Sequence, residues 1–450
     1  MTINRRRLLV SAGAAGALAG IGLPGIGQAE TRATYDGESW RHLFMLNRDP
    51  LFMNIGTVGS PPREVVRTVA AETERVSREA ASSYDNLFPD IRGQAATSLG
   101  CDVDELWISS NTTDGMGTVL NGLALGEGDE VLTTNHEHAS SNTPLAMLHN
   151  RRGVVTRRVA LPIGDNQRAE DYVALFEAAI TPRTKVLLFS APGYRTGTML
   201  PIRMLADLAQ RHGLITVVDG AHVPGMFAYN FHELGVDFLA GSGAKWQCGP
   251  ARTGLLYLRN KVLPEHNPNP LAEFWPTITS SEAYPEAGLP PRTSTATASY
   301  DVAALLQNAG NPNVAQMAGL GAAFRLWDQI GRKNIENHSV GLANRLKAAV
   351  AERWGVGALY SPKSDPRLRS AMTTFNPFAR KADVLDKAKA EAFVARVLAD
   401  HQIKIRNTTV AVIGSATPHY PLRISTHLFH SRRDVDRFVD AAWRVSRAVG

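Results

Sequence analysis

The chain has 450 residues, of which 44% are hydrophobic and 20% are charged, and its formal net charge is +6. At roughly 150 residues per domain, this length predicts two or three domains, and the hydrophobic fraction excludes disorder along the whole chain. The two cysteines, Cys101 and Cys248, are too few for a disulfide framework or for a zinc site built from cysteines.

Residues 1–29 have the order of an export signal. Three arginines at positions 5–7 precede a stretch rich in Gly and Ala at 8–26, and small residues follow up to Ala29, where we expect signal peptidase to cleave. The arginine pair followed by two leucines resembles a twin-arginine signal. We therefore expect the twin-arginine translocase to export the chain to the periplasm.

The alternative for this segment is an ordinary helix or a membrane anchor. An anchor needs about 20 consecutive residues of strongly apolar character, whereas 8–26 contains five glycines and Pro24, so we expect no stable anchor. Removal of 1–29 takes away three arginines and no acid, which leaves a charge of +3. A balance so close to neutral gives no reason to expect a nucleic-acid partner.

Short apolar runs alternate with amphipathic stretches from about residue 90 to 260, which predicts a mostly parallel sheet with helices on both faces. The candidate strands are 130–133, 154–159, 185–189, 214–218, 238–240 and 255–258. Ligands of such sheets bind beyond the carboxyl ends of the strands. The residues that follow each run are therefore the candidates for function.

The pattern changes after Asn311. One long helical pattern at 314–350 comes first, followed by a helix at 387–400, a strand at 422–425 and a final helix at 433–449. These elements predict a second, smaller α/β domain.

Asp219 follows the strand at 214–218, and Lys245 comes shortly after the strand at 238–240. A pyridoxal phosphate enzyme needs this pair, because the lysine forms a Schiff base with the aldehyde and the aspartate keeps the pyridine nitrogen protonated. The residues alone leave two alternatives open. Asp219 could cap a helix, and Lys245 could be a solvated loop residue.

A second candidate site lies at 109–115, where Ser, Asn, Thr, Asp and Gly stand before a helical run. Hydroxyl groups and exposed amides at a helix N-terminus bind anions, which would suit a cofactor phosphate. Capping of the same helix is the alternative.

Four segments, at 112–115, 135–138, 218–225 and 244–257, resemble the class-V aminotransferases, and most closely the branch that contains isopenicillin N epimerase. The resemblance implies a fold-type I pyridoxal 5′-phosphate (PLP) enzyme that forms a homodimer, with a large domain on a mostly parallel seven-stranded sheet and a smaller C-terminal α/β domain. It divides the mature chain into three parts. These are an N-terminal segment at 30–80 that contributes to the substrate site and the small domain, a PLP-binding domain at 81–310, and a linking helix with the small domain at 311–450.

The resemblance also implies roles for single residues. Lys245 carries the cofactor and Asp219 pairs with the pyridine nitrogen. His136 stacks on the cofactor ring, with His138 as the rival. The remaining cofactor contacts implied are His222 near the cofactor oxygen, Thr112, Thr113 and Ser242 at the phosphate, and Thr295 reaching the phosphate from the partner subunit. The two histidines have no third ligand nearby, so we expect no metal.

Arg423 matches the arginine that binds the substrate carboxylate in this family, as a guanidinium fork can, and Gly56 and Thr57 resemble the substrate-facing loop. Two residues depart from the family pattern. Ala244 replaces a polar residue, and Tyr194 stands where a small polar side chain is usual.

The motifs leave the reaction open between transamination, epimerisation, β-elimination and oxidative decarboxylation. No cysteine follows Cys248, which disfavours a desulfurase that passes sulfur on through a mobile thiol. We expect an aminotransferase or epimerase that acts on an amino acid or on an amino-acid unit of a small secreted metabolite. The alternatives are a C–S lyase, a siderophore-tailoring enzyme and a PLP-binding protein without activity.

Overall fold

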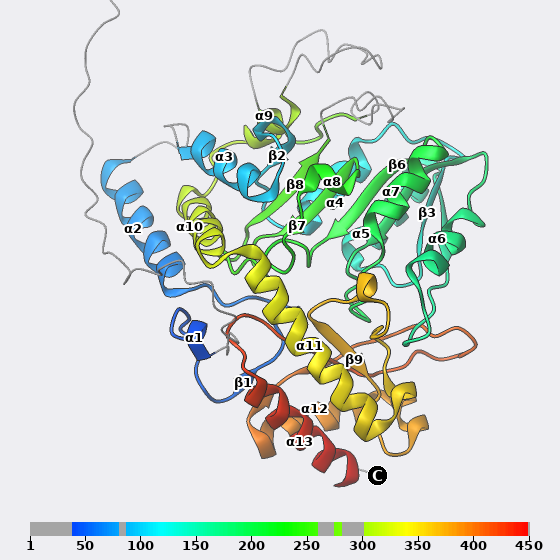
Figure 1. Ribbon diagram of the computed structural model, residues 1–450. Coiled ribbons are helices and arrows are strands. Elements are labelled where there is room, and N and C mark those ends of the chain that lie inside the picture. Colours follow the sequence, from blue (N-terminus) through cyan, green and yellow to red (C-terminus); the bar gives the residue numbers. More distant parts are fainter. Residues whose placement is uncertain (1–37, 81–86, 260–273, 281–300, 449–450) are drawn as a thin grey trace, which may run out of the picture. The chain divides into compact units, whose positions relative to one another are not determined.

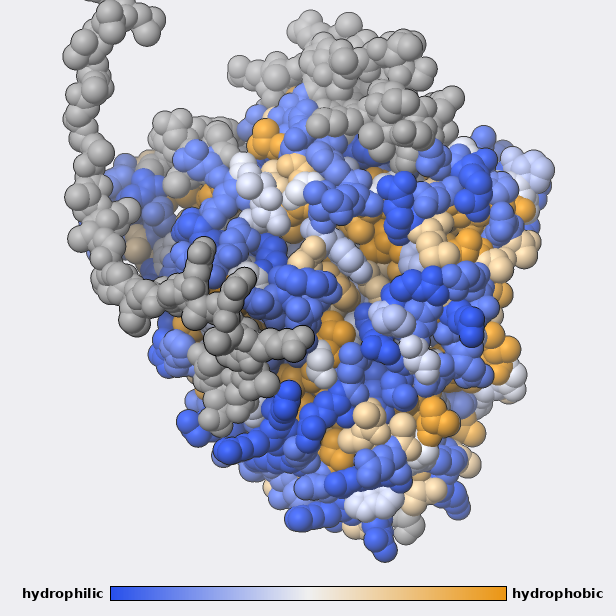
Figure 2. All heavy atoms as spheres, viewed as in Figure 1, coloured by the Kyte–Doolittle hydropathy of each residue, from blue (hydrophilic) through white to orange (hydrophobic). Residues whose placement is uncertain are grey.

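A computed structural model describes residues 38–80, 87–259, 274–280 and 301–448 (Figure 1). The predicted export signal and Thr295 lie outside these ranges. None of the helices in the described ranges is long and apolar enough to span a bilayer. Hydrophilic side chains predominate on the face shown in Figure 2, with hydrophobic ones in small groups between them.

A seven-stranded sheet lies at the centre of the larger part of the fold (Figure 1). Its spatial order is β2 (Leu106–Trp107), β8 (Gly254–Leu258), β7 (Phe238–Ser242), β6 (Ile215–Gly220), β5 (Thr184–Ser190), β3 (Glu130–Thr134) and β4 (Val155–Val159). Only β8 runs antiparallel to its neighbours β7 and β2. The predicted seven-stranded, mostly parallel sheet is therefore confirmed.

The central strands are buried on both faces, which is why they form continuous apolar runs. Along β5, Val186 and Leu188 pack into one hydrophobic cluster, and Leu187 and Phe189 into another. The first cluster lies under α4 (Thr112–Gly122), α5 (Ala139–Arg152) and α9 (Val302–Gln307). The second lies under α3 (Leu87–Leu99), α6 (Ala169–Glu177), α7 (Ile202–Arg211), α8 (Phe231–Leu234) and α10 (Val314–Ile330).

A third hydrophobic cluster belongs to the C-terminal part of the chain. There α11 (Arg332–Trp354), α12 (Lys387–His401) and α13 (Arg432–Ala448) accompany an antiparallel sheet in the order β11 (Arg406–Asn407), β12 (Leu422–Ser425) and β9 (Met372–Phe375). The N-terminal strand β1 (Leu51–Phe52) pairs with β10 (Ile403–Lys404). This pairing places the segment at 51–59 beside the small sheet, where Met53 and Gly56 form hydrogen bonds with Ser425 of β12.

The predicted helix at 314–350 is wrong in one respect, because the structure breaks it into α10 and α11 at Gly331. Gly331 has φ +90, a conformation outside the helical region that glycine adopts without strain. Two helices near the N-terminus, the short α1 (Glu38–Arg41) and the longer α2 (Arg63–Glu79), had no counterpart in the predicted elements, and α2 packs along α10 (Figure 1).

Candidate active site

A cavity of about 500 Å³ lies at the carboxyl ends of β5, β6 and β7. This volume is within the usual range for small-molecule sites. The strand-end residues Ser190, Asp219 and Ser242 line it, and side chains from the small sheet form another wall. The described residues that line it are Gly56, Thr57, Asn111, Thr112, Thr113, His138, Ala139, Ser140, Ser190, Pro192, Tyr194, Asp219, Ala221, His222, Ser242, Lys245, Arg406 and Arg423.

Asp219 and Lys245 come together because β6 and β7 are adjacent and parallel, with Asp219 paired to Ala240 in the register. Removal of the Lys245 amine from bulk water lowers its pKa to about 8; the nearby Asp219 charge opposes this shift, and the charges of Arg423 and Arg406 add to it. Only a minority of the amine is neutral near physiological pH, but this fraction is far larger than for an unshifted lysine and can act as a nucleophile or a base.

Asp219 is fixed in place by two donors. Its Oδ2 accepts a hydrogen bond from the Ser140 hydroxyl at 2.7 Å, and its Oδ1 accepts one from the Ala221 backbone N–H at 3.1 Å. Ser140 belongs to the first turn of α5, so this helix and β6 hold the carboxylate jointly. Such support is what a charged group needs in order to keep one orientation in a binding site.

His222 is held in one tautomer by its neighbour Trp246. The indole Nε1–H of Trp246 donates to His222 Nδ1 at 2.9 Å, so the single proton of the neutral ring resides on Nε2. Burial, together with the positive charges of Lys245 and Arg423, lowers the pKa of His222 well below its usual value. The ring therefore stays neutral, and its Nε2–H is a hydrogen-bond donor on a residue that lines the cavity.

The structure places His138 at the cavity wall, and not His136, which the sequence analysis had assigned to the cofactor ring. His136 is buried, and its Nε2 hydrogen bonds with the carbonyl oxygen of Ala411 at 2.8 Å. Glu137 directs this loop, because its carboxylate accepts hydrogen bonds from Thr134 and Ser190 and so turns toward the sheet. His138 then caps α5, its Nδ1 accepting from the Ser140 N–H at 3.1 Å.

The anion site predicted at 109–115 is the N-terminus of α4, which begins at Thr112. Asn111 caps this helix, since its Oδ1 accepts a hydrogen bond from the Asp114 N–H at 2.9 Å. Asn111, Thr112 and Thr113 line the cavity together with Ser242 at the end of β7. Capping and anion binding are thus compatible here, because the cap uses Asn111 and leaves both threonine hydroxyls to the cavity.

Arg423 lies on β12, on the small-sheet wall of the cavity, and is only 1% exposed. Its guanidinium donates to the Tyr194 carbonyl oxygen at 3.0 Å, to Asn54 Oδ1 at 3.2 Å and to Thr57 Oγ1 at 2.9 Å. Burial is the main cause that lowers its pKa, to about 9, and the charge of Arg406 adds to the effect. A carboxylate would relieve this unfavourable burial of positive charge.

Two glycines let the chain come close to the lysine. A Cβ on Gly59 would lie 2.1 Å from the Lys245 carbonyl oxygen, and the Gly59 N–H donates to the Ala244 carbonyl at 2.8 Å. Gly225 has φ +83, and a Cβ there would lie 2.3 Å from the carbonyl carbon of Trp246. The backbone on each side of the lysine is thereby held by segments from two other parts of the chain.

Three buried polar atoms at the cavity have no hydrogen-bond partner in the described part of the chain, which indicates that a polar ligand fits there. They are Thr112 Oγ1, His222 Nε2 and Arg423 Nε, and all three belong to residues that line it. Buried polar groups are rarely left unsatisfied in proteins. Hydroxyls at a helix N-terminus, a neutral N–H donor, a carboxylate and a lysine amine with a lowered pKa match the phosphate, the ring oxygen, the pyridine nitrogen and the aldehyde of PLP.

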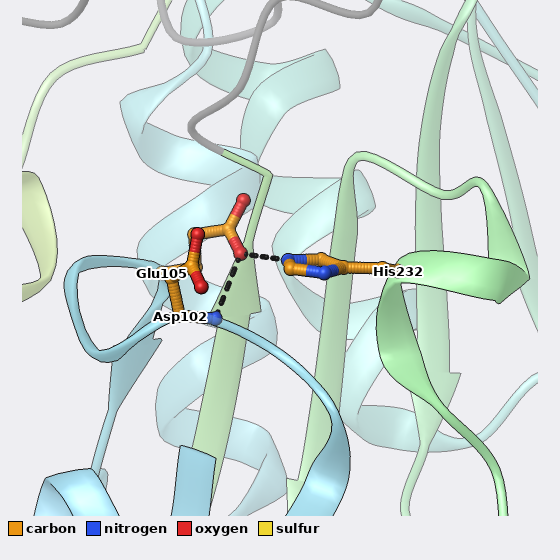
Figure 3. A group of neighbouring side chains, drawn as sticks. All are labelled: Asp102, Glu105 and His232. Carbon is orange, nitrogen blue, oxygen red and sulfur yellow. Dashed lines mark hydrogen bonds and ion pairs between the residues drawn. The ribbon is translucent and has the colours of Figure 1, made fainter. Parts of the chain in front are cut away.

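A second group of ionisable side chains joins α8 to the segment before β2, and none of them lines the cavity (Figure 3). It consists of Asp102, Glu105 and His232. Glu105 hydrogen bonds with the His232 ring and accepts from the Asp102 backbone N–H, as part of a short helical cap. These contacts account for the cluster as a link between α8 and the segment that precedes β2.

The sequence motifs therefore located most of the cavity wall, namely Lys245, Asp219, His222, Thr112, Thr113, Ser242, Arg423, Gly56 and Thr57. Three contributors were missed: Ser140 beside Asp219, Trp246 as the partner of His222, and Arg406. No motif marks Arg406, but it stands directly opposite Arg423 in the pairing of β11 with β12, so a correct pairing of those strands would have found it.

The geometry is that of a fold-type I PLP-dependent enzyme, and comparison with known proteins agrees. The sequence model of the family described as aminotransferase class-V matches residues 62–438. The chain belongs to the class-V aminotransferase family, and its cofactor is pyridoxal 5′-phosphate.

The chain is similar to enzymes of two kinds, among others. Isopenicillin N epimerase of Streptomyces clavuligerus is 27% identical over 416 residues, which cover 91% of this chain and 98% of the relative. The enzyme of the same name from Amycolatopsis lactamdurans is 31% identical over 46% of this chain and 53% of its own. A cysteine desulfurase of Haloferax volcanii is 27% identical over 81% of this chain and 80% of its own.

Solved structures share the fold at lower identity. A cysteine desulfurase from Thermococcus onnurineus superposes with a TM-score of 0.72 at 21% identity, over 92% of this chain and 99% of the other. A mutant of C-DES with glycine covalently linked to its PLP cofactor gives 0.71 at 22% identity, over 90% and 98%.

The lowered pKa of Lys245 predicts how the cofactor-free protein takes up PLP. Only the neutral amine attacks an aldehyde, so the uptake rate should rise about tenfold per pH unit at low pH and level off above about pH 8. Stopped-flow absorbance measures this rate, and an exposed model amine such as N-acetyl-lysine serves as the control. A rate that kept rising to about pH 10.4, the range of an unperturbed lysine, would contradict the assignment.

A second prediction concerns Trp246, which is fully buried. Trp246→Phe removes the N–H that holds the His222 tautomer, and loss of one such hydrogen bond should weaken PLP binding by about 2- to 10-fold. Nitrogen-15 NMR of the histidine ring should show the Nε2–H tautomer in the parent and a mixture in the variant. Trp354→Phe is the matched control, since Trp354 Nε1 donates to Pro377 in the small core. A parent protein that already carried the Nδ1–H tautomer would refute this role.

Proposed function

We propose that this enzyme moves the α-proton of an amino-acid substrate with Lys245, in a reaction of the aminotransferase or epimerase type. One cavity carries the proposal, because it holds both Lys245, whose pKa is lowered to about 8, and the buried Arg423, whose hydrogen-bond acceptors among the described residues include no carboxylate. Removal of the α-proton from an amino acid requires a base, here the lysine amine, and a group that binds the substrate carboxylate, here the arginine.

Each residue has a separate task in the proposal. Arg423 holds the substrate carboxylate and so orients the α-carbon. Lys245 takes up the α-proton once its amine is free, and it can return that proton later. Asp219 faces the pyridine nitrogen, held by Ser140 and Ala221. His138 covers the cofactor ring in place of His136, and Thr112, Thr113 and Ser242 hold the phosphate. When bound, PLP supplies the electron sink that makes the α-proton acidic.

A C–S lyase is the second candidate, because desulfurases stand beside epimerases among the relatives. A relay of sulfur through a cysteine of this chain is not supported. Neither Cys101 nor Cys248 lines the cavity, both are buried, and burial raises the pKa of the Cys248 thiol to about 12. Such a thiol is a poor nucleophile at neutral pH, so a lyase reaction here would have to release its sulfur product directly.

The proposal includes export to the periplasm and a homodimer. The arginines at 5–7, the apolar stretch and the small residues up to Ala29 support export, and the family resemblance supports a dimer in which Thr295 reaches the partner's cofactor phosphate. An exported enzyme of this kind would meet amino acids or amino-acid units of secreted metabolites, a siderophore among them.

Exchange of the α-proton tests the proposed reaction. In deuterium oxide the holoenzyme should incorporate deuterium at Cα of its substrates, and Lys245→Ala should slow this exchange by about 10²- to 10⁴-fold. Mass spectrometry measures the incorporation, and the exposed Lys387, changed to Ala, is the control. Chiral chromatography, with and without a keto acid, then separates epimerisation from transamination, and sulfide release from cysteine would reveal a lyase.

Two results would overturn the proposed reaction. Exchange that survives in Lys245→Ala would remove the lysine from the proton transfer. A holoenzyme that binds PLP but exchanges no α-proton in any of a full set of L- and D-amino acids would favour the PLP-binding protein without activity.

The export proposal has its own test. Replacement of Arg5 and Arg6 together by lysine should leave the precursor in the cytoplasm, because the twin-arginine pathway recognises the arginine pair. Cell fractionation with immunoblotting measures precursor and mature forms. The control variant Arg7→Lys keeps both Arg5 and Arg6, and it should still be exported. If the double variant reaches the periplasm, the general secretory route carries the protein.

A further inference from the structure

Arg406 forms a second guanidinium in the substrate wall of the cavity. It lies on β11, directly opposite Arg423 in the antiparallel pairing with β12. Residues directly opposite in such a pair project from the same face of the sheet. Both arginines line the cavity, and both donate to one oxygen, Thr57 Oγ1, Arg406 Nη1 at 3.3 Å and Arg423 Nη2 at 2.9 Å.

The charges around this pair are unbalanced. Asp219 is the one carboxylate among the described residues that line the cavity, against the cationic side chains of Lys245, Arg406 and Arg423. Asp219 is engaged with Ser140 and Ala221 at the other end of the site. Within the described ranges both arginines donate only to carbonyl, amide and hydroxyl oxygens, and no carboxylate forms an ion pair with either. Two adjacent cations without a counterion are unfavourable unless a ligand brings negative charge.

The hydrogen bonds of Arg406 to described residues engage two of its three guanidinium nitrogens and leave Nη2 available to a ligand. Its Nε donates to the Asn407 carbonyl at 2.9 Å and its Nη1 to Thr57, and no residue of the described chain receives a hydrogen bond from its Nη2. The cofactor phosphate is not the natural partner, because its predicted contacts are on α4 and at the end of β7, whereas Arg406 shares Thr57 with the substrate arginine.

We propose that Arg406 is a subsite for a second acidic group, so that the substrate is an amino acid, or an amino-acid unit, with a side-chain carboxylate. Arg423 holds the α-carboxylate and Arg406 the distal one, the guanidinium fork matching a carboxylate in both places. This inference rests on the proposed function, because it assumes that Arg423 faces the α-carboxylate.

Binding of unreactive diacids tests the subsite without any turnover. Isothermal titration of the holoenzyme compares succinate and glutarate with their monoamides, which keep the shape and remove one charge. The parent protein should bind at least one diacid at least tenfold more tightly than its monoamide. Arg406→Gln should reduce that preference to within about twofold and leave the monoamide affinity unchanged, because only the distal contact is lost.

Two further variants complete the design. Lys404→Gln removes a positive charge two residues away, from an exposed side chain that lies over the Phe52 ring and does not line the cavity, and it should keep the preference. Arg406→Lys retains the charge and should keep part of the preference, which also covers the case in which Arg406→Gln does not fold. Thermal unfolding confirms that each variant is folded.

Three outcomes would overturn the subsite. The first is a parent protein that binds each diacid and its monoamide equally well. The second is an Arg406→Gln variant that retains the full preference for the diacid. The third is an Arg406→Gln variant whose affinity falls for diacids and for monoamides alike, which would mean that both arginines bind a single carboxylate. None of these results touches the α-proton exchange, so failure of the subsite and failure of the proposed reaction can be told apart.

Discussion

The site depends on one electrostatic arrangement, in which a single carboxylate, Asp219, lies among the described cavity residues with three basic side chains. The adjacent parallel strands β6 and β7 create it by placing Asp219 and the loop of Lys245 at the same edge of the sheet. Burial and the two arginines favour the neutral form of the Lys245 amine, while Asp219 opposes that effect. The balance leaves a base that can act near neutral pH and a cavity that attracts anions.

The two histidines of the cavity, His222 and His138, add little positive charge to this arrangement, because burial lowers the pKa of both. His222 is fully buried and cannot easily take up a proton, and Trp246 fixes which nitrogen carries the one it has. His138 is held as a helix cap, with burial lowering its pKa as well. The close approach of Gly59 and Gly225 to the backbone beside Lys245 couples the lysine loop to the N-terminal segment and to the β6 loop. Packing and electrostatics therefore act on the same few residues.

Much of this could be predicted from the sequence, for physical reasons. Central parallel strands are buried on both faces, so they appear in the sequence as continuous apolar runs. The end of the run at 214–218 locates Asp219, and the end of the run at 238–240 locates Lys245. The alternation of strands and helices predicted the mostly parallel sheet and the family resemblance its seven strands, whereas their spatial order came from the structure. The short strand β9 and the pairing of β11 with β12 were not visible, because two to four residues carry too little periodicity. Arg406 was missed for that reason.

The choice between His136 and His138 shows a second limit. Sequence spacing places both histidines after β3, but the side chain of Glu137 decides which one reaches the cavity, through hydrogen bonds to Thr134 and to Ser190 on another strand. The break at Gly331 is similar, since the apolar pattern continues through it and only the backbone conformation ends the helix. Contacts between distant segments determine such details, and spacing within one segment does not contain them.

The central claim is that Lys245 carries the cofactor, and one measurement tests it directly. The holoenzyme is reduced with borohydride, digested and mapped by mass spectrometry. The account predicts a single pyridoxyl-modified peptide, with the modification on Lys245 of the segment Gly243-Ala244-Lys245-Trp246. A modification on another lysine, or a reduced protein with no covalently attached cofactor, would contradict it.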